Sequence, residues 1–394
     1  MNINPSTALR DKCAIVGIGN SRLGKVPGVS SLDLLVEAMV NALDDAGLKT
    51  SDIDGLICRG PDDAYGHHQL IGARLGINAN ISTTMDNGGA SQILSIAMAV
   101  MAIEAGLATT VLCGFGRDAW SRTHVTEEAR VRNETRPDSQ RAREFGPEYG
   151  YFGAVAAHAF GAQRHMHLYG TTRDHFAEIA IAFREHALRN PQAQMKKPLT
   201  KADYDAARLI VAPFGLFDCS LRSDGAGAVI VTSRARAKDL KQPPVPIKGF
   251  GSFNNLRGWF QDDNMVVTAA KKSGETAYKM AGLGPADIDT AQIYDCFTYM
   301  VLTQLEDYGF CKKGEGGDFV ASGALRMGGR LPTNTSGGQL SESHVEGMLQ
   351  IVEGARQMRH TYGADRQVKD AEVALISGHG GNQVCHSTLI LGRA

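Results

Sequence analysis

The sequence lacks a long hydrophobic run, a signal-peptide pattern and an excess of charge of either sign. Its longest apolar run, residues 93–103, ends at Glu104 and is too short to cross a bilayer. The opening residues, MNINPSTALRDK, do not show the basic-then-apolar order of a secretory signal. Because 41 basic residues face 42 acidic ones, neither nucleic acid nor a membrane surface is an expected partner. We expect a cytoplasmic, globular protein.

Cysteine is sparse, and its spacing excludes two common uses of thiols. The seven cysteines are odd in number and contain no C-x-x-C pair; they stand at positions 13, 58, 113, 219, 296, 311 and 385. Neither a disulfide framework nor a zinc site is therefore predicted. The glycines of GIGNSRLG (residues 17–24) do not have the G-x-G-x-x-G spacing of a dinucleotide loop, and no phosphate loop occurs. We expect neither a metal nor a separate cofactor.

Two segments of the chain occur twice, in the same order. DDAGLKTSDIDGLI (residues 44–57) reappears as KMAGLGPADIDTAQI (279–293), with Gly47 and Gly282 in positions that suit helix C-caps. DNGGASQ (86–92) reappears as TSGGQLSESH (335–344), and each copy precedes a helical stretch and then a strand that ends in glycine. This pattern indicates a duplicated unit of strands and helices.

The duplication divides the chain into residues 1–240 and 245–394, joined by the proline-containing KQPPVP (241–246). Strands that alternate with amphipathic helices predict an α/β fold, with a mostly parallel, helix-covered sheet in each half. The first half is longer by about residues 117–200. We expect this insertion to form a lid over a substrate site.

Four motifs give the chain a family resemblance. They are DCSLRSDGAGAVIV (218–231), YDCF (294–297), SHVEG (343–347) and GHGGN (378–382). In this order they resemble the thiolase superfamily, and within it the sterol-carrier and lipid-transfer-protein branch. The resemblance covers essentially the whole chain. It implies a duplicated, five-layered αβαβα fold with a loop domain inserted in the first half.

The departures from the family pattern concern its two catalytic thiols. The resemblance places the acylated cysteine at Gly89 and the second, acid–base cysteine at Gly378. A covalent acyl-enzyme is therefore not expected, because covalent catalysis needs a nucleophile at the reacting carbon. Without a side chain at Gly89, we expect more room beside a thioester.

The loop that carries Gly89 is a candidate anion site. Gly88, Gly89, Ala90 and Ser91 precede a long apolar helix, and a helix N-terminus offers unpaired N–H groups and a positive dipole end. We expect this loop to stabilise an oxyanion or a thioester enolate. Ser91 is expected to cap the helix.

Three side chains in the motifs are candidates for proton transfer. Tyr294 replaces the histidine or asparagine of the family motif at a strand end, His344 occupies the family's histidine position at the start of a helix, and His379 lies in a glycine-rich turn. Asp295 and Cys296 are interpreted as buried, structural residues.

An oxyanion site, a tyrosine and a histidine without a thiol suit proton-transfer chemistry on an acyl-CoA. Cysteine-less members of the branch resemble steroid side-chain aldolases, which cleave a β-hydroxyacyl-CoA by a retro-aldol reaction. That resemblance implies Tyr294 as the base, His344 as an enolate stabiliser, and coenzyme A as part of the substrate.

Three alternatives stay open at this point. A thiolase could use Cys385 or Cys296 as its nucleophile. Ser91 could be the nucleophile with His344 as its base. The chain could also be a non-catalytic subunit that binds CoA esters.

The resemblance also implies partners. We expect a homodimer and a small OB-fold, zinc-ribbon partner protein, together a heterotetramer. Aromatic residues in the insertion suit an interface; they are Trp120, Phe145, Tyr149, Tyr151 and Phe152.

Overall fold

The strands of both halves form one mixed sheet in the computed structural model, which describes residues 5, 7–60, 66–124, 153–256 and 265–394. The strand order is β3-β2-β4-β7-β1-β8-β11-β10-β9. The first half contributes β1 (Cys13–Asn20), β2 (Gly55–Arg59), β3 (Ile81–Thr84), β4 (Thr110–Asp118) and β7 (Asp224–Ser233). The second half contributes β8 (Val245–Asn254), β9 (Thr290–Gln292), β10 (Val373–Gly380) and β11 (Cys385–Gly392).

The strand order confirms the duplication. Reading outward from the centre, β1-β7-β4-β2 in the first half corresponds to β8-β11-β10-β9 in the second. The halves meet where β1 pairs with β8, at Ala14 opposite Pro246 and Ile15 opposite Val245. Gly47 and Gly282 both end their helices in the left-handed conformation, as predicted from the repeated A-G-L segments.

The expectation of a mostly parallel sheet in each half is wrong. β2 pairs in parallel with β3 and β4, and β9 with β10, but β7 and β11 run antiparallel to their neighbours. The short turn from β10 to β11 explains the second case, because adjacent strands joined by a tight turn must be antiparallel. Strand direction thus follows from the connection, which hydrophobic patterning does not reveal.

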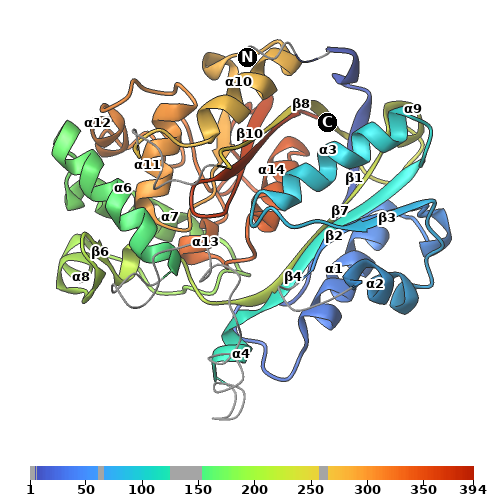
Figure 1. Ribbon diagram of the computed structural model, residues 1–394, viewed down its shortest axis with the longest axis horizontal. Coiled ribbons are helices and arrows are strands. Elements are labelled where there is room, and N and C mark those ends of the chain that lie inside the picture. The colour runs from blue at the N-terminus through green and yellow to red at the C-terminus, as the bar shows by residue number, and fades with distance from the viewer. Residues whose placement is uncertain (1–4, 6, 61–65, 125–152, 257–264) are drawn as a thin grey trace.

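Helices form the remaining layers. α1 (Ser31–Ala46) covers the outer face of the first half and α10 (Ala270–Ala281) that of the second. α3 (Ser91–Glu104) and α14 (Met348–Met358) contact strands of both halves and lie between them (Figure 1). Outside the segment between β4 and β7, the structure also contains α2 (His67–Leu75), α9 (Arg234–Ala237), α11 (Thr298–Asp307), α12 (Gly316–Ala321) and α13 (Gly338–Ser341).

Alternation along β1 shows how this strand separates two layers. Cys13 and Ile15 belong to the inner core, together with residues of α3 and α14. Ala14 and Val16 belong to the outer core, together with residues of α1. Successive side chains of a strand point to opposite faces, so a strand with helices on both sides is apolar throughout.

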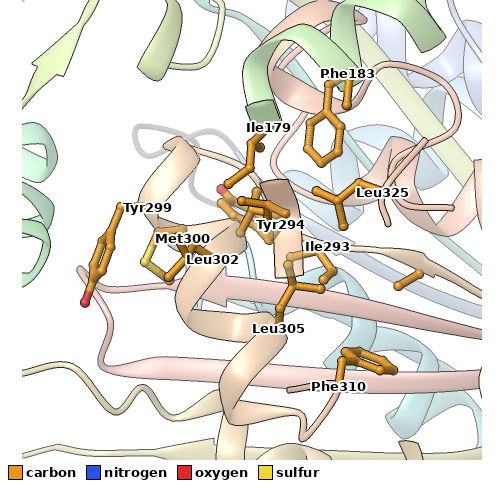
Figure 2. Close-up of a cluster of buried hydrophobic side chains, with 14 of the residues drawn as sticks. Ile179, Phe183, Ile293, Tyr294, Tyr299, Met300, Leu302, Leu305, Phe310 and Leu325 are labelled. Atoms are coloured by element: carbon orange, nitrogen blue, oxygen red, sulfur yellow. The ribbon is translucent and has the colours of Figure 1, made fainter. Parts of the chain in front are cut away.

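The segment between β4 and β7 occupies residues 119–223, so it extends beyond the expected residue 200. Its described helices and strands are α4 (Ala119–His124), α6 (Gly153–Tyr169), α7 (Arg173–Arg189), α8 (Lys201–Ala206), β5 (Leu209–Val211), β6 (Phe214–Gly215) and the short 3-10 helix Leu216–Asp218. Figure 2 shows Ile179 and Phe183 of α7 beside Tyr294 and Leu325, in one buried cluster. The insertion therefore shares a core with the second half.

The structure describes only part of the aromatic group that was predicted to suit an interface. Trp120 lies in α4, whereas Phe145, Tyr149, Tyr151 and Phe152 lie outside the described residues. Within the described ranges, no helix is long and apolar enough to cross a membrane.

Candidate active site

The glycine loop before α3 is held by hydrogen bonds within itself. The Gly88 N–H donates to Asp86, the Ala90 N–H to the Asn87 carbonyl and the Ser91 N–H to the Gly88 carbonyl. The Ser91 hydroxyl, which is fully buried, accepts the Asn87 N–H at 2.6 Å. Three of the four N–H groups expected to receive an anion, those of Gly88, Ala90 and Ser91, are therefore engaged locally.

The two glycines at the lost thiol positions lie against each other. A Cβ atom at Gly378 would lie 2.8 Å from the Gly89 carbonyl oxygen. A Cβ atom at Gly89 would lie 2.3 Å from Cε2 of Tyr294 and 2.4 Å from the His379 carbonyl oxygen. The Tyr294 ring thus occupies the space where the side chain of a nucleophile would begin. The expectation of free space beside Gly89 is therefore wrong, because the Tyr294 ring fills that space.

This contact predicts the outcome of restoring the thiol. In Gly89→Cys, the new Cβ overlaps Tyr294, so the ring must move and turnover should fall by about 100-fold, the scale of a misplaced catalytic group. No thiolysis should appear, because the second thiol is also missing. Gly72→Ala is the matched control, since its Cβ would meet nothing closer than 3.7 Å. Steady-state lyase and thiolysis assays on both variants provide the measurement, and a gain of thiolysis would contradict the prediction.

Tyr294 follows the short strand β9 and is fixed by its backbone. Its N–H donates to the Ser377 hydroxyl at 2.8 Å, and its carbonyl accepts the Gln304 side-chain amide at 2.9 Å. The residue is only 5% exposed. Burial, with the negative charge of Glu346 adding to it, raises the pKa of Tyr294 well above 10. The phenol therefore carries its proton at neutral pH.

His344 lies beside the Tyr294 hydroxyl. Nε2 of His344 lies 3.5 Å from the Tyr294 hydroxyl oxygen. Nδ1, the other ring nitrogen of His344, lies 3.0 Å from the Ser220 hydroxyl. The backbone N–H of His344 donates to the Ser223 hydroxyl. Burial, reinforced by Arg117, lowers the pKa of His344 to about 3. The ring is therefore neutral at neutral pH, and it lies in a loop, because the helix predicted to begin there starts at Met348.

His379 lies in β10, opposite His386, rather than in the turn that follows. Its ring centroid lies 5.6 Å from that of Tyr294, and its Nε2 lies 3.1 Å from Nε2 of His158 in α6. Nδ1 has no hydrogen-bond partner among the described residues. Burial, followed by the neighbouring His158, lowers the pKa of His379 well below its ordinary value.

Glu346 connects this site to the ends of two strands. Its carboxylate pairs with Arg59 at the end of β2 and with Arg117 of β4, the latter at 3.0 Å. Burial alone would raise the pKa of Glu346, but the two arginines hold it below its ordinary value. The Gln92 side chain of α3 donates to the backbone carbonyl of Glu346. The Glu346 backbone itself has φ +44°, in the left-handed region. These contacts hold the loop between His344 and α14 in a conformation that costs a non-glycine residue energy.

Comparisons with known proteins show the family of the chain. Residues 13–206 match the thiolase N-terminal domain, and residues 251–393 match the thiolase C-terminal domain-like family. A 17-hydroxy-3-oxo-4-pregnene-20-carboxyl-CoA lyase of Mycobacterium tuberculosis is 37% identical over 98% of this chain and 100% of its own. The chain belongs to the thiolase family.

Two further relatives of this thiolase-family chain cover nearly its whole length. A steroid side-chain-cleaving aldolase of Thermomonospora curvata is 35% identical over 100% of this chain and 99% of its own. A solved structure described as an Ltp2-ChsH2(DUF35) aldolase matches with a TM-score of 0.88 and 34% identity, over 98% of each chain. The predicted thiolase fold is confirmed.

The side chains considered as alternative thiolase nucleophiles are poorly placed to attack. Burial raises the pKa of Cys296 well above its ordinary value, and it also raises that of Cys385, with Asp86 adding to it. Both residues are therefore thiols at neutral pH rather than thiolates. Ser91 has no hydrogen bond to His344 in the described structure, and its oxygen braces the loop instead. Asp295 is a structural anchor that accepts three hydrogen bonds, from the Gln339 and Leu340 N–H groups and from Gln350.

Several site residues escaped the sequence analysis. Ser220, Ser223 and Glu346 lie within the quoted motifs, so their positions beside His344 could have been suspected from those segments. Arg59 and Arg117 were harder to identify from the sequence. The one indication was a charged arginine at or near the end of a largely apolar strand. His158 had none, because nothing local distinguishes it from other histidines of an amphipathic helix.

Proposed function

We propose that this protein cleaves a carbon–carbon bond of a β-hydroxyacyl-CoA by a retro-aldol reaction, giving a ketone and a short acyl-CoA. The observation that carries the proposal is the Tyr294 ring in the place of the first thiol's side chain, with glycine at both thiol positions. Relatives that cover nearly the whole chain are named as a steroid side-chain lyase and aldolase. A steroid side-chain CoA ester is therefore the proposed substrate.

The protonation states of the site favour a revised assignment of roles. His344 is neutral and offers Nε2 as an acceptor, so we assign it the proton of the β-hydroxyl. Tyr294 keeps its O–H and is the donor, which reverses the role of base expected from the sequence. As the Cα–Cβ bond breaks, its electron pair forms the thioester enolate, and the β-carbon becomes the ketone. Tyr294 then protonates the enolate carbon and recovers a proton from His344 across their contact.

The enolate oxygen needs a donor at the start of α3. We assign this role to the Gly89 N–H, because it lies in the loop just before α3, where the N-terminal end of the helix dipole favours negative charge. This chemistry uses no separate cofactor, and coenzyme A enters as part of the substrate. His379 stays a secondary candidate for the proton donor.

Product analysis combined with intact-mass spectrometry tests the proposal. Incubation with a steroid side-chain β-hydroxyacyl-CoA should release a ketone and acetyl-CoA or propionyl-CoA, while the protein mass stays unchanged. A stable acyl adduct on Cys296, Cys385 or Ser91 would instead support a thiolase with an unusual nucleophile. Tight binding of the CoA ester without turnover, even with a partner protein present, would support a non-catalytic binding subunit.

The proposed assembly is a heterotetramer of two such chains and two partner chains. β3 ends the sheet as an edge strand, so this edge suits pairing with a second copy of the chain. The solved aldolase is named with a DUF35 component, which supports a second protein as partner. We propose that this partner is a small OB-fold, zinc-ribbon protein. Seven free cysteines favour a reducing, cytoplasmic location.

Light scattering and activity assays, with and without the partner, check this assembly. We expect a dimer from the chain alone with low activity, and a heterotetramer with full activity once the partner is added. Full activity from the isolated dimer would contradict the partner requirement, and it would leave the retro-aldol chemistry untouched.

A further inference from the structure

Three buried donor side chains from separate elements converge behind Tyr294. They are His158 of α6, Cys296 of the loop after β9 and His379 of β10, and their donor atoms all lie within 4.8 Å of one another. The two imidazole Nε2 atoms are 3.1 Å apart, and Cys296 Sγ lies 4.0 Å from Nε2 of His158. Each residue is less than 9% exposed.

The hydrogen bonding of His158 directs a lone pair into this cluster. Its Nδ1 lies 2.6 Å from the Ala154 carbonyl oxygen, so Nδ1 carries the proton and Nε2 is an acceptor. A backbone carbonyl on the second ring nitrogen is the arrangement that orients a metal-binding histidine. The ring is also packed against Phe297, at a centroid distance of 4.8 Å, which restricts its rotation.

We propose that His158, Cys296 and His379 bind a divalent cation of the zinc class. Two imidazoles and a thiolate suit Zn²⁺ or Co²⁺, whereas Mg²⁺ and Ca²⁺ prefer oxygen ligands, and no carboxylate belongs to this cluster. Tetrahedral Zn²⁺, with bonds of about 2.0–2.3 Å, separates its ligand atoms by roughly 3.3–3.6 Å. The observed spacings therefore need only modest side-chain shifts, and a fourth position is left for another ligand.

Binding converts the Cys296 thiol to a thiolate and releases its proton to solvent. It also commits Nε2 of His379 to the metal, so that proton transfer rests with Tyr294 and His344. No sequence motif indicates this site, because the ligands do not have the close spacing of zinc motifs; His158 and Cys296 are 138 residues apart. The proposal does not depend on the retro-aldol function, and it has its own readout.

Cobalt spectroscopy on the full-length chain tests the site. After treatment with a chelator, titration with Co²⁺ should give one bound ion per chain, with a thiolate-to-cobalt charge-transfer band and visible absorption of four-coordinate Co²⁺. Zn²⁺ should displace it. Cys296→Ser should abolish the charge-transfer band and weaken binding by more than about 100-fold, since even loss of an outer partner costs roughly 10- to 100-fold.

Two controls keep the result interpretable. Cys311→Ser changes a cysteine outside the cluster and should leave the spectrum unchanged. His158→Gln removes a nitrogen ligand and should weaken Co²⁺ binding to a similar degree, with circular dichroism and thermal unfolding reporting whether each variant is folded. No charge-transfer band in the parent protein, or an equal band in folded Cys296→Ser, would overturn the proposal and leave an imidazole–imidazole hydrogen bond as the whole role of the pair.

Discussion

Tyr294→Phe is expected to lower turnover by about 100-fold or more, the scale of a lost general acid. The substitution removes the hydroxyl that lies 3.5 Å from His344, and that hydroxyl is the proposed proton donor to the enolate carbon. The ring remains, so it still fills the space beside Gly89, and the fold should survive. Turnover should fall while the Michaelis constant changes little, because the lost interaction belongs to the transition state.

Tyr278→Phe is the matched control for this substitution. Tyr278 also loses a single hydroxyl hydrogen bond, to the Tyr308 carbonyl at 3.3 Å, but it lies on α10 at the outer face of the second half. We expect a stability loss of about 1 kcal/mol from the lost bond and unchanged turnover. Near-normal turnover in Tyr294→Phe would show that another group donates the proton, and His379 would be the next residue to test.

Sequence reasoning predicted those parts of the fold that depend on residues close together in the sequence and on the order of the motifs. The repeated A-G-L segments placed both left-handed helix caps, and the order of the motifs brought Gly89, Tyr294, His344 and Gly378 to one place. The direction of β7 and β11 was missed, because a strand covered on both faces is apolar throughout whether it runs parallel or antiparallel to its neighbours.

The protonation and the packing of the site could not be predicted from the sequence. The sequence placed a tyrosine and a histidine together, but it could not show that burial keeps both neutral, which exchanges their proposed roles. Nor could it show that the Tyr294 ring fills the space at Gly89. His158 illustrates the same limit, since His379, the partner of its Nε2, is 221 residues away. Contacts over such separations depend on how whole layers pack.

His344→Ala is expected to be as severe as the tyrosine substitution, with turnover lowered by about 100-fold or more. The change removes the acceptor proposed to take the β-hydroxyl proton, and it leaves the Ser220 hydroxyl without its partner. A graded series separates these effects. Ser220→Ala keeps the imidazole and removes only the group that orients Nδ1, so we expect a smaller loss, of about 10-fold.

The pH dependence provides the readout that a purely structural role would not change. A histidine whose pKa is lowered to about 3 is already the neutral base throughout the range in which an ordinary histidine titrates, roughly pH 5–8. The rate should therefore show no histidine step across that range, and it should fall only as the pH approaches the lowered value. In Ser220→Ala the rate should be lower at every pH. A parent enzyme that loses activity on acidification with a midpoint near pH 6.5 would contradict the assignment, because the essential base would then be an unshifted histidine.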